Sequence, residues 1–277
     1  MQIVSAPTSR GSVPLSCPYI ARFQDYIRAE YSGRSKHWAC AKSLIEAVAE
    51  RLAETACPLG DWVDLLPVAR QLRVKVTFAP CRPPKGGMLL PEEHGFSAAI
   101  DGRPDQPRAR FTLAHEFGHV FFYDLEQVPP QPFFFHAAEG REARREEGLC
   151  DAFAAALLLP LRFFTAEVDQ AASMNYLVAQ AVRRRVSVEV FLRRVLHGVG
   201  WLRCCSFYAV SQRTPPGIRV RRFVGLDVQR TGIRAAELAD RLAHCSPAEL
   251  CSALASHLGD RADVFRGAST TWVKVAG

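Results

Sequence analysis

The sequence predicts an α+β protein, in which helices and strands occupy separate runs of the chain. Apolar side chains recur at helical spacing over about residues 36–57 and again over 61–72. Three short strand-like stretches follow, over 73–80, 86–90 and 95–102, and helical patterns then return. The 277 residues show no internal repeat and suffice for more than one hydrophobic core.

The N-terminal part divides into a polar stretch and two helices. Residues 1–18 are rich in Ser and Pro, and we expect residues 1–35 to form a flexible segment. Helical spacing then begins with the apolar side chains Trp38, Leu44, Ile45, Val48 and Leu52. Asp61 is placed to act as the N-cap of the second helix.

The composition is typical of a soluble globular protein, with 48% hydrophobic and 23% charged residues. The longest apolar run, at 152–161, is half the length of a membrane span, and the N-terminus lacks a signal-peptide core. The nine cysteines are an odd number and contain no CxxC pair, which favours reduced thiols. We therefore expect a cytoplasmic protein without membrane contact.

The stretch ARFTLAHEFGHVFFYD, residues 109–124, carries two histidines four residues apart. Side chains at this spacing share one face of a helix, so His115 and His119 can direct their imidazoles to one point. Glu116 can reach a water molecule there, which completes the HExxH pattern of zinc peptidases with glutamate as general base. Gly118 costs about 1 kcal/mol relative to Ala inside a helix. We therefore expect another backbone to approach closely at this glycine.

A second pair of acids lies in the predicted helix EEGLCDAFAAALLLP. A catalytic zinc site needs a third protein ligand, and Glu147 is placed to supply it. Asp151 shares the face of Glu147 and could hold a histidine ligand through its other ring N–H. Glu146 is rotated by about 100° around the helix axis, and we expect it to face solvent or nearby arginines. Two imidazoles and a carboxylate suit Zn²⁺, and could also accept Mn²⁺ or Fe²⁺.

These two motifs resemble the signature of the ImmA/IrrE metallo-endopeptidases. The first reads RFTLAHEFGH at 110–119, and the second reads EGLCDAFAAALLLP at 147–160. The resemblance extends upstream through GGMLLPEEHGFSAAIDG and downstream through LVAQAVRRRVSVEVFLRRVLHGVGW. It covers roughly residues 40–202.

The resemblance implies a zincin-like metallopeptidase domain, which we place at residues 36–165. Carried over position by position, it makes His115, His119 and Glu147 the metal ligands and Glu116 the catalytic base. Members of this family cleave a partner transcriptional repressor, often a helix-turn-helix protein. The resemblance therefore implies a protein substrate of that kind, in a stress or mobile-element response.

Two features of the predicted site remain open. An oxyanion could be stabilised by Tyr123, which we expect in the same helix as the motif, or by His136 in the following loop, and the sequence favours neither. An extended substrate could add to the edge of the strand at 86–90 or of the strand at 95–102.

Residues 166–202 show a helix, a short turn and a second helix, with basic side chains that contribute to the net charge of +7. The arginines at 183–185, together with Arg193 and Arg194, could contact DNA. We favour packing of this helix-turn-helix-like segment on the protease domain, because the second helix offers few base-reading side chains. The pattern of residues 203–277 predicts strands followed by helices. We expect a small α/β region there, with either a sensory or a structural role.

Two other functions compete with a repressor-cleaving endopeptidase. One is a DNA-binding regulator that uses the protease fold as a scaffold, and the other is an interaction module of the toxin–antitoxin type. The intact Glu116 favours the enzyme, because a vestigial site would be expected to lose its base before its ligands.

Overall fold

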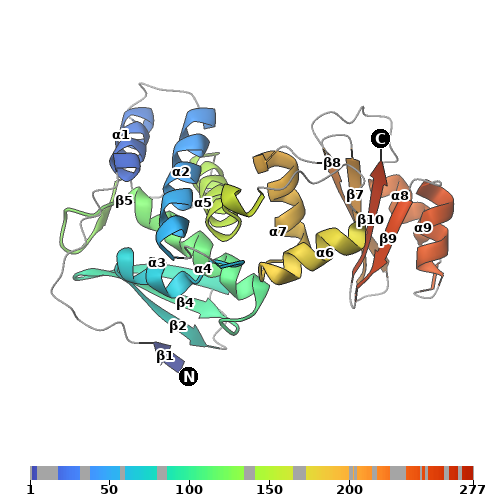
Figure 1. Cartoon of the computed structure of the whole chain (residues 1–277). Coiled ribbons are helices and arrows are strands. Elements are labelled where there is room, and N and C mark those ends of the chain that lie inside the picture. Colours follow the sequence, from blue (N-terminus) through green and yellow to red (C-terminus); the bar gives the residue numbers. More distant parts are fainter. Residues whose placement is uncertain are drawn as a thin grey trace. The chain divides into compact units, whose positions relative to one another are not determined.

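A computed structural model describes the chain at 2–4, 18–31, 38–56, 60–79, 86–133, 141–164, 173–199, 202, 205–213, 217–224, 235–243, 245–246, 249–258, 262–267 and 270–276. Helices and strands mix in two compact units (Figure 1). The first comprises Met1–Phe163 with Arg183–Ser187, and the second comprises Phe164–Val182 with Val188–Gly277. No helix within the described ranges is long and apolar enough to cross a membrane.

The first unit contains a four-stranded sheet in the order β1-β2-β4-β3, formed by β1 (Gln2–Val4), β2 (Val74–Ala79), β3 (Gly87–Glu92) and β4 (Gly95–Asp101). β2 and β4 are parallel, whereas β3 and β4 form an antiparallel hairpin. The three strands predicted from the sequence are thus confirmed. β3 lies at one edge of this sheet and β1 at the other.

Much of the rest of this core is built by α2 (Trp38–Ala56), α3 (Leu65–Gln71), α4 (Pro107–His119) and α5 (Arg141–Leu158). α5 packs against both α2 and α4. α4 begins at a proline, whose missing N–H costs nothing in the first turn. The buried core includes Ile45, Val48, Val76, Phe96, Leu113, Phe117, Phe121, Phe153 and Leu157.

The expected cap of α3 was wrong. The N-cap is Asp64, whose carboxylate accepts a hydrogen bond from the Leu66 N–H at 3.0 Å, and not Asp61. Proline explains the later start, because Pro67 then lies in the first turn, where a backbone N–H has no helical partner.

The expectation of a flexible segment over residues 1–35 was also wrong for two parts of it. β1 pairs with β2, and α1 (Pro18–Tyr31) packs on α2. Ile20, Phe23 and Ile27 recur at helical spacing and are buried, and Phe23 contacts Phe122 edge to face at 5.7 Å between ring centroids. Burial of this apolar stripe stabilises the helix although the surrounding sequence is polar.

After α4 the chain forms a short 3₁₀ turn, η2 (Val120–Phe122), and a small hairpin of β5 (Tyr123–Asp124) and β6 (Gln131–Pro132). A further 3₁₀ turn, η3 (Leu161–Phe164), follows α5.

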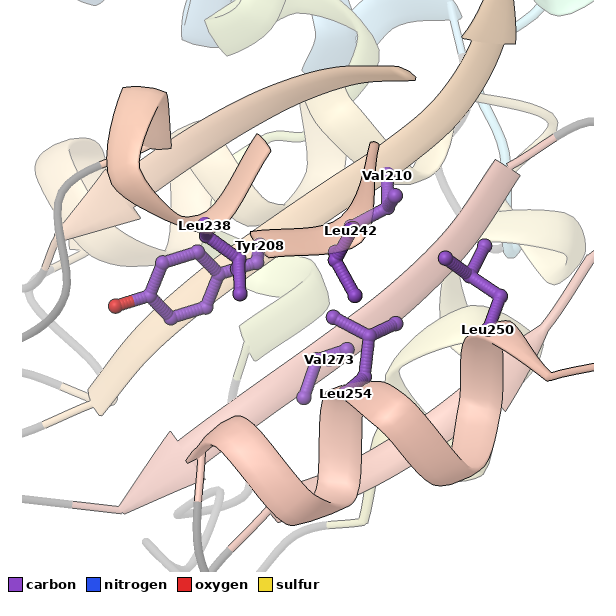
Figure 2. Packing of buried hydrophobic residues seen from close by; sticks show 7 residues of the cluster. All are labelled: Tyr208, Val210, Leu238, Leu242, Leu250, Leu254 and Val273. Atoms are coloured by element: carbon purple, nitrogen blue, oxygen red, sulfur yellow. The ribbon is translucent and has the colours of Figure 1, made fainter. Parts of the chain in front are cut away.

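The second unit holds an antiparallel sheet in the order β8-β7-β10-β9. Its elements are α6 (Met174–Arg183), α7 (Val188–Arg193), the π-helical turn η4 (Arg194–Val199), β7 (Cys205–Arg213), β8 (Gly217–Val224), α8 (Ala235–Leu242), α9 (Leu250–Leu258), β9 (Ala262–Arg266) and β10 (Thr270–Ala276). Figure 2 shows how α8 and α9 turn leucines toward the sheet, in a cluster of Tyr208, Val210, Leu238, Leu242, Leu250, Leu254 and Val273.

Three consecutive arginines, beginning with the last residue of α6, belong to the first unit and contact other residues of it. Arg183 pairs with Asp61 at 2.8 Å, Arg184 donates to the Phe163 carbonyl at 3.0 Å, and Arg185 stacks on Trp62 at 3.9 Å from the ring centroid. These contacts pack the turn on Asp61, Trp62 and Phe163, all within the first unit.

Candidate metal centre

Helices α4 and α5 approach each other at Gly118. A Cβ atom on this residue would lie 2.9 Å from the Cα atom of Cys150, closer than real Cβ atoms pack. The expected close approach of another backbone is therefore confirmed, and the partner is α5. This contact sets the acids of α5 against the histidines of α4.

The two histidines of α4 converge as their spacing predicted. Their Nε2 atoms lie 3.2 Å apart, and Glu147 Oε2 lies 3.2 Å from His115 Nε2. On the other side of each ring, His115 Nδ1 lies 2.9 Å from Asp151 Oδ1, and His119 Nδ1 lies 2.8 Å from Glu146 Oε1. Each imidazole thus contacts a carboxylate through its Nδ1 atom, and the two Nε2 atoms face a common point.

The donor set fits a divalent cation. Carboxylates accept hydrogen bonds, so each Nδ1 must donate, and a neutral imidazole then presents a lone pair at Nε2. Two nitrogen ligands of a tetrahedral Zn²⁺, each about 2.0–2.1 Å from the ion, are about 3.3 Å apart. The Nε2 atoms of His115 and His119 are separated by 3.2 Å, and a cation between them would remove the repulsion of their lone pairs.

Glu146 departs from the expectation that it faces solvent. It is 7% exposed and contacts His119. The reason is its position four residues before Cys150, the residue that packs on Gly118, which places Glu146 on the same side of α5. The predicted orientation toward solvent was wrong. The face of α5 that packs on α4 includes Glu146 as well as Glu147 and Asp151.

The acids around the site act on the charge of His115. Burial disfavours its imidazolium, but the hydrogen bond to Asp151 and the charges of Asp151, Glu116 and Glu147 raise the pKa of His115 above its usual value. A site that favours a positive charge at this point also favours a bound cation.

Glu116 lies on α4 beside the first residue of β3. Its side chain is buried, and a Cβ atom on Gly87 would lie 2.7 Å from Glu116 Oε1. Only glycine leaves room for the carboxylate there. The start of the edge strand β3 is therefore adjacent to the residue that the motif assigns as base.

Tyr123 is half-buried and lies in β5, not in the helix of the motif as predicted, because α4 ends at His119. Burial, followed by the charges of Glu146 and Glu116, raises the pKa of Tyr123, so its hydroxyl stays protonated at neutral pH. A protonated hydroxyl is what an oxyanion donor requires. The other candidate, His136, lies outside the described residues.

Sequence reasoning missed Cys150 as a component of the site. Its Sγ atom and one ring nitrogen each of His115 and His119 lie within 4.8 Å of one another. Burial, followed by the nearby carboxylates, raises the pKa of Cys150 well above its usual value, which favours the neutral thiol over a thiolate ligand. The signal that could have found it is its position between Glu147 and Asp151.

Arg110 anchors α4 five residues before His115. It is 4% exposed and donates hydrogen bonds to the carbonyl oxygens of Val63 at 2.8 Å and Arg185 at 3.2 Å. Burial, followed by the charge of Arg185, lowers the pKa of Arg110 to about 10, so it remains charged at neutral pH. It links the helix of the site to the turn that precedes α7.

Comparison with known proteins found a family match and similarities to solved structures. Residues 69–196 match the model of Peptidase_M78, the IrrE N-terminal-like domain. A search of curated proteins found no match. Among solved structures, a Mycobacterium tuberculosis transcriptional regulator is similar, with 14% sequence identity and a TM-score of 0.44. The similarity covers 93% of this chain and 81% of the regulator's chain.

Proposed function

Because residues 69–196 form a domain of the IrrE N-terminal-like family, Peptidase_M78, we propose that this protein is a zinc-dependent endopeptidase with a zincin-like catalytic domain. One observation carries the proposal. His115 Nε2 lies 3.2 Å from both His119 Nε2 and Glu147 Oε2, as ligands of one cation would. The buried carboxylate of Glu116 lies on the same helix as the two imidazoles.

Zn²⁺ held by His115, His119 and Glu147 would supply Lewis acidity, which activates water and polarises a carbonyl. Glu116 then takes a proton from the attacking water and delivers it to the leaving amine. Asp151 would orient the His115 ligand, since its hydrogen bond with Nδ1 at 2.9 Å keeps Nε2 of His115 directed toward the cation. The protonated hydroxyl of Tyr123 is the candidate oxyanion donor among the described residues.

The edge strand β3 provides a place for the substrate backbone. An extended peptide could pair with its outer edge, and a peptide bound there would pass Gly87 and the Glu116 carboxylate. A substrate that adds as a strand must be cleaved in an extended or transiently unfolded segment. We propose a partner transcriptional repressor, of the helix-turn-helix type, as that substrate.

The test is incubation of the zinc-loaded protein with the product of the adjacent gene and with candidate helix-turn-helix repressors. We expect cleavage at one or a few sites, identified by mass spectrometry, which stops with a chelator and returns with added Zn²⁺. Parallel reactions with Mn²⁺ decide which metal supports activity. Full metal occupancy without cleavage of any repressor segment would contradict the proposal and favour an interaction module.

A further inference from the structure

Each of the two imidazoles in the candidate metal centre has its own carboxylate behind it, but the two pairs differ in burial. The Asp151 side chain is 62% exposed, whereas the Glu146 side chain is 9% exposed. The contact of Glu146 with His119 is also short, at 2.8 Å. The motif of paired acids accounts for Asp151 and leaves Glu146 without a role.

We propose that Glu146 is a positioning residue of the metal centre, which holds Nδ1 of His119 so that Nε2 faces the cation. The inference rests on the proposed function, because it assumes that His119 is a ligand. It adds a residue of this chain that the two sequence motifs do not assign.

Burial strengthens the contact of Glu146 with His119. A buried carboxylate is costly unless it accepts hydrogen bonds, and a hydrogen bond that involves a charged group is stronger away from water. The contact of Glu146 with His119 is therefore screened less than the contact of exposed Asp151 with His115. We expect Glu146 to constrain its imidazole more tightly than Asp151 does.

The charges around the site lead to the same expectation. The carboxylates of Glu146, Glu147, Glu116 and Asp151 all act on the buried thiol of Cys150, so four negative charges lie around one region. Like charges at close range repel, and a divalent cation would offset that repulsion. Neutralising Glu146, the carboxylate that touches a ligand from a buried position, should weaken cation binding.

Glu146→Gln tests the role, because the amide keeps the shape of the side chain and an acceptor oxygen but removes the charge. We expect the zinc affinity, measured by competition with a chromophoric chelator, to fall about 10- to 100-fold. The unfolding temperature of the metal-free protein should stay close to that of the wild type. The ligand-field absorption of the Co²⁺-loaded protein should also change, because it reports the orientation of the imidazole ligands.

Two further variants make the experiment specific. Glu93→Gln removes a carboxylate whose side chain is 80% exposed and should leave affinity and spectrum unchanged. Asp151→Asn should cost less affinity than Glu146→Gln. All affinities are measured at a temperature at which circular dichroism shows every variant folded. Glu146→Asp, which keeps the charge, serves as the second variant and should bind zinc more tightly than Glu146→Gln.

The failures of the two proposals are distinguishable. If the wild type binds zinc and Glu146→Gln binds it within about twofold, the role of Glu146 is overturned while the proposed function stands. A lower unfolding temperature with unchanged affinity would make Glu146 a structural residue and would also overturn the inference. If the wild type binds no zinc, the metal centre itself is wrong, and the role of Glu146 falls with it.

Discussion

His115 and His119 approach each other through their Nε2 atoms, 3.2 Å apart on α4, while their Nδ1 atoms contact two different carboxylates of α5. The arrangement requires two helices in contact. Neither helix alone can orient the imidazoles, because the supporting acids lie 36 and 27 residues further along the chain. Metal binding and the packing of α4 on α5 should therefore stabilise each other.

The first prediction concerns the base. Glu116→Gln should retain zinc and lose peptide cleavage, because all three candidate ligands remain while the proton acceptor is gone. Metal content by atomic absorption and cleavage of the repressor, followed by gel electrophoresis, measure the two effects separately. Cleavage at the wild-type rate would remove Glu116 from the mechanism.

The second prediction concerns the histidines. His115→Ala and His119→Ala should each lose zinc, and the zinc-dependent rise in unfolding temperature should disappear. For the wild type, free zinc at 100 times the dissociation constant adds about 2.7 kcal/mol to the free energy of unfolding. Differential scanning calorimetry with and without zinc measures this term. Equal metal content in variant and wild type would rule out the ligand role.

The third prediction separates a ligand from its support. Glu147→Ala should reduce zinc affinity at least tenfold, because an oxygen donor 3.2 Å from His115 Nε2 is lost. Asp151→Ala should lose less, within about 10- to 100-fold in affinity or activity, since it removes only the partner of Nδ1. Competitive titration of both variants decides the order. A larger loss in Asp151→Ala would exchange the two roles.

The fourth prediction concerns the helix contact. Gly118→Ala should lower the free energy of unfolding by about 1–3 kcal/mol, because the added Cβ meets the backbone of α5. Gly148→Ala is a matched control, since Gly148 is an exposed helical glycine and the change should stabilise by about 1 kcal/mol or less. Denaturant unfolding of the metal-free proteins measures both. Equal stability of the two variants would contradict the close approach.

The fifth prediction concerns the buried thiol. Cys150→Ala should keep zinc, because we propose Glu147, and not Cys150, as the third ligand. The Co²⁺-loaded wild type should accordingly lack the intense near-ultraviolet band of a cobalt–thiolate bond. The same burial should protect Cys150 from alkylation in the folded protein, whereas exposed Cys40 should react. Peptide mapping after a short iodoacetamide treatment compares the two cysteines.

Local features of the site were readable from the sequence. Residues four apart share a helix face whatever the helix packs on, so the convergence of His115 with His119 and the common face of Glu147 with Asp151 follow from helix periodicity. Alternation and hairpin residues likewise predicted β2, β3 and β4. The close approach of another backbone at Gly118 was also predicted correctly, because a glycine inside a helix is unfavourable unless the packing requires it.

Contacts between distant segments decided the rest. The side of α5 that meets α4 depends on the packing of Gly118 on Cys150, and that contact brings Glu146 to His119 and the thiol beside both imidazoles. Strand order made β3 the edge strand next to the site, since the order in a sheet does not follow from the strands themselves. Periodicity describes one element at a time, and only tertiary packing selects which of its faces become neighbours.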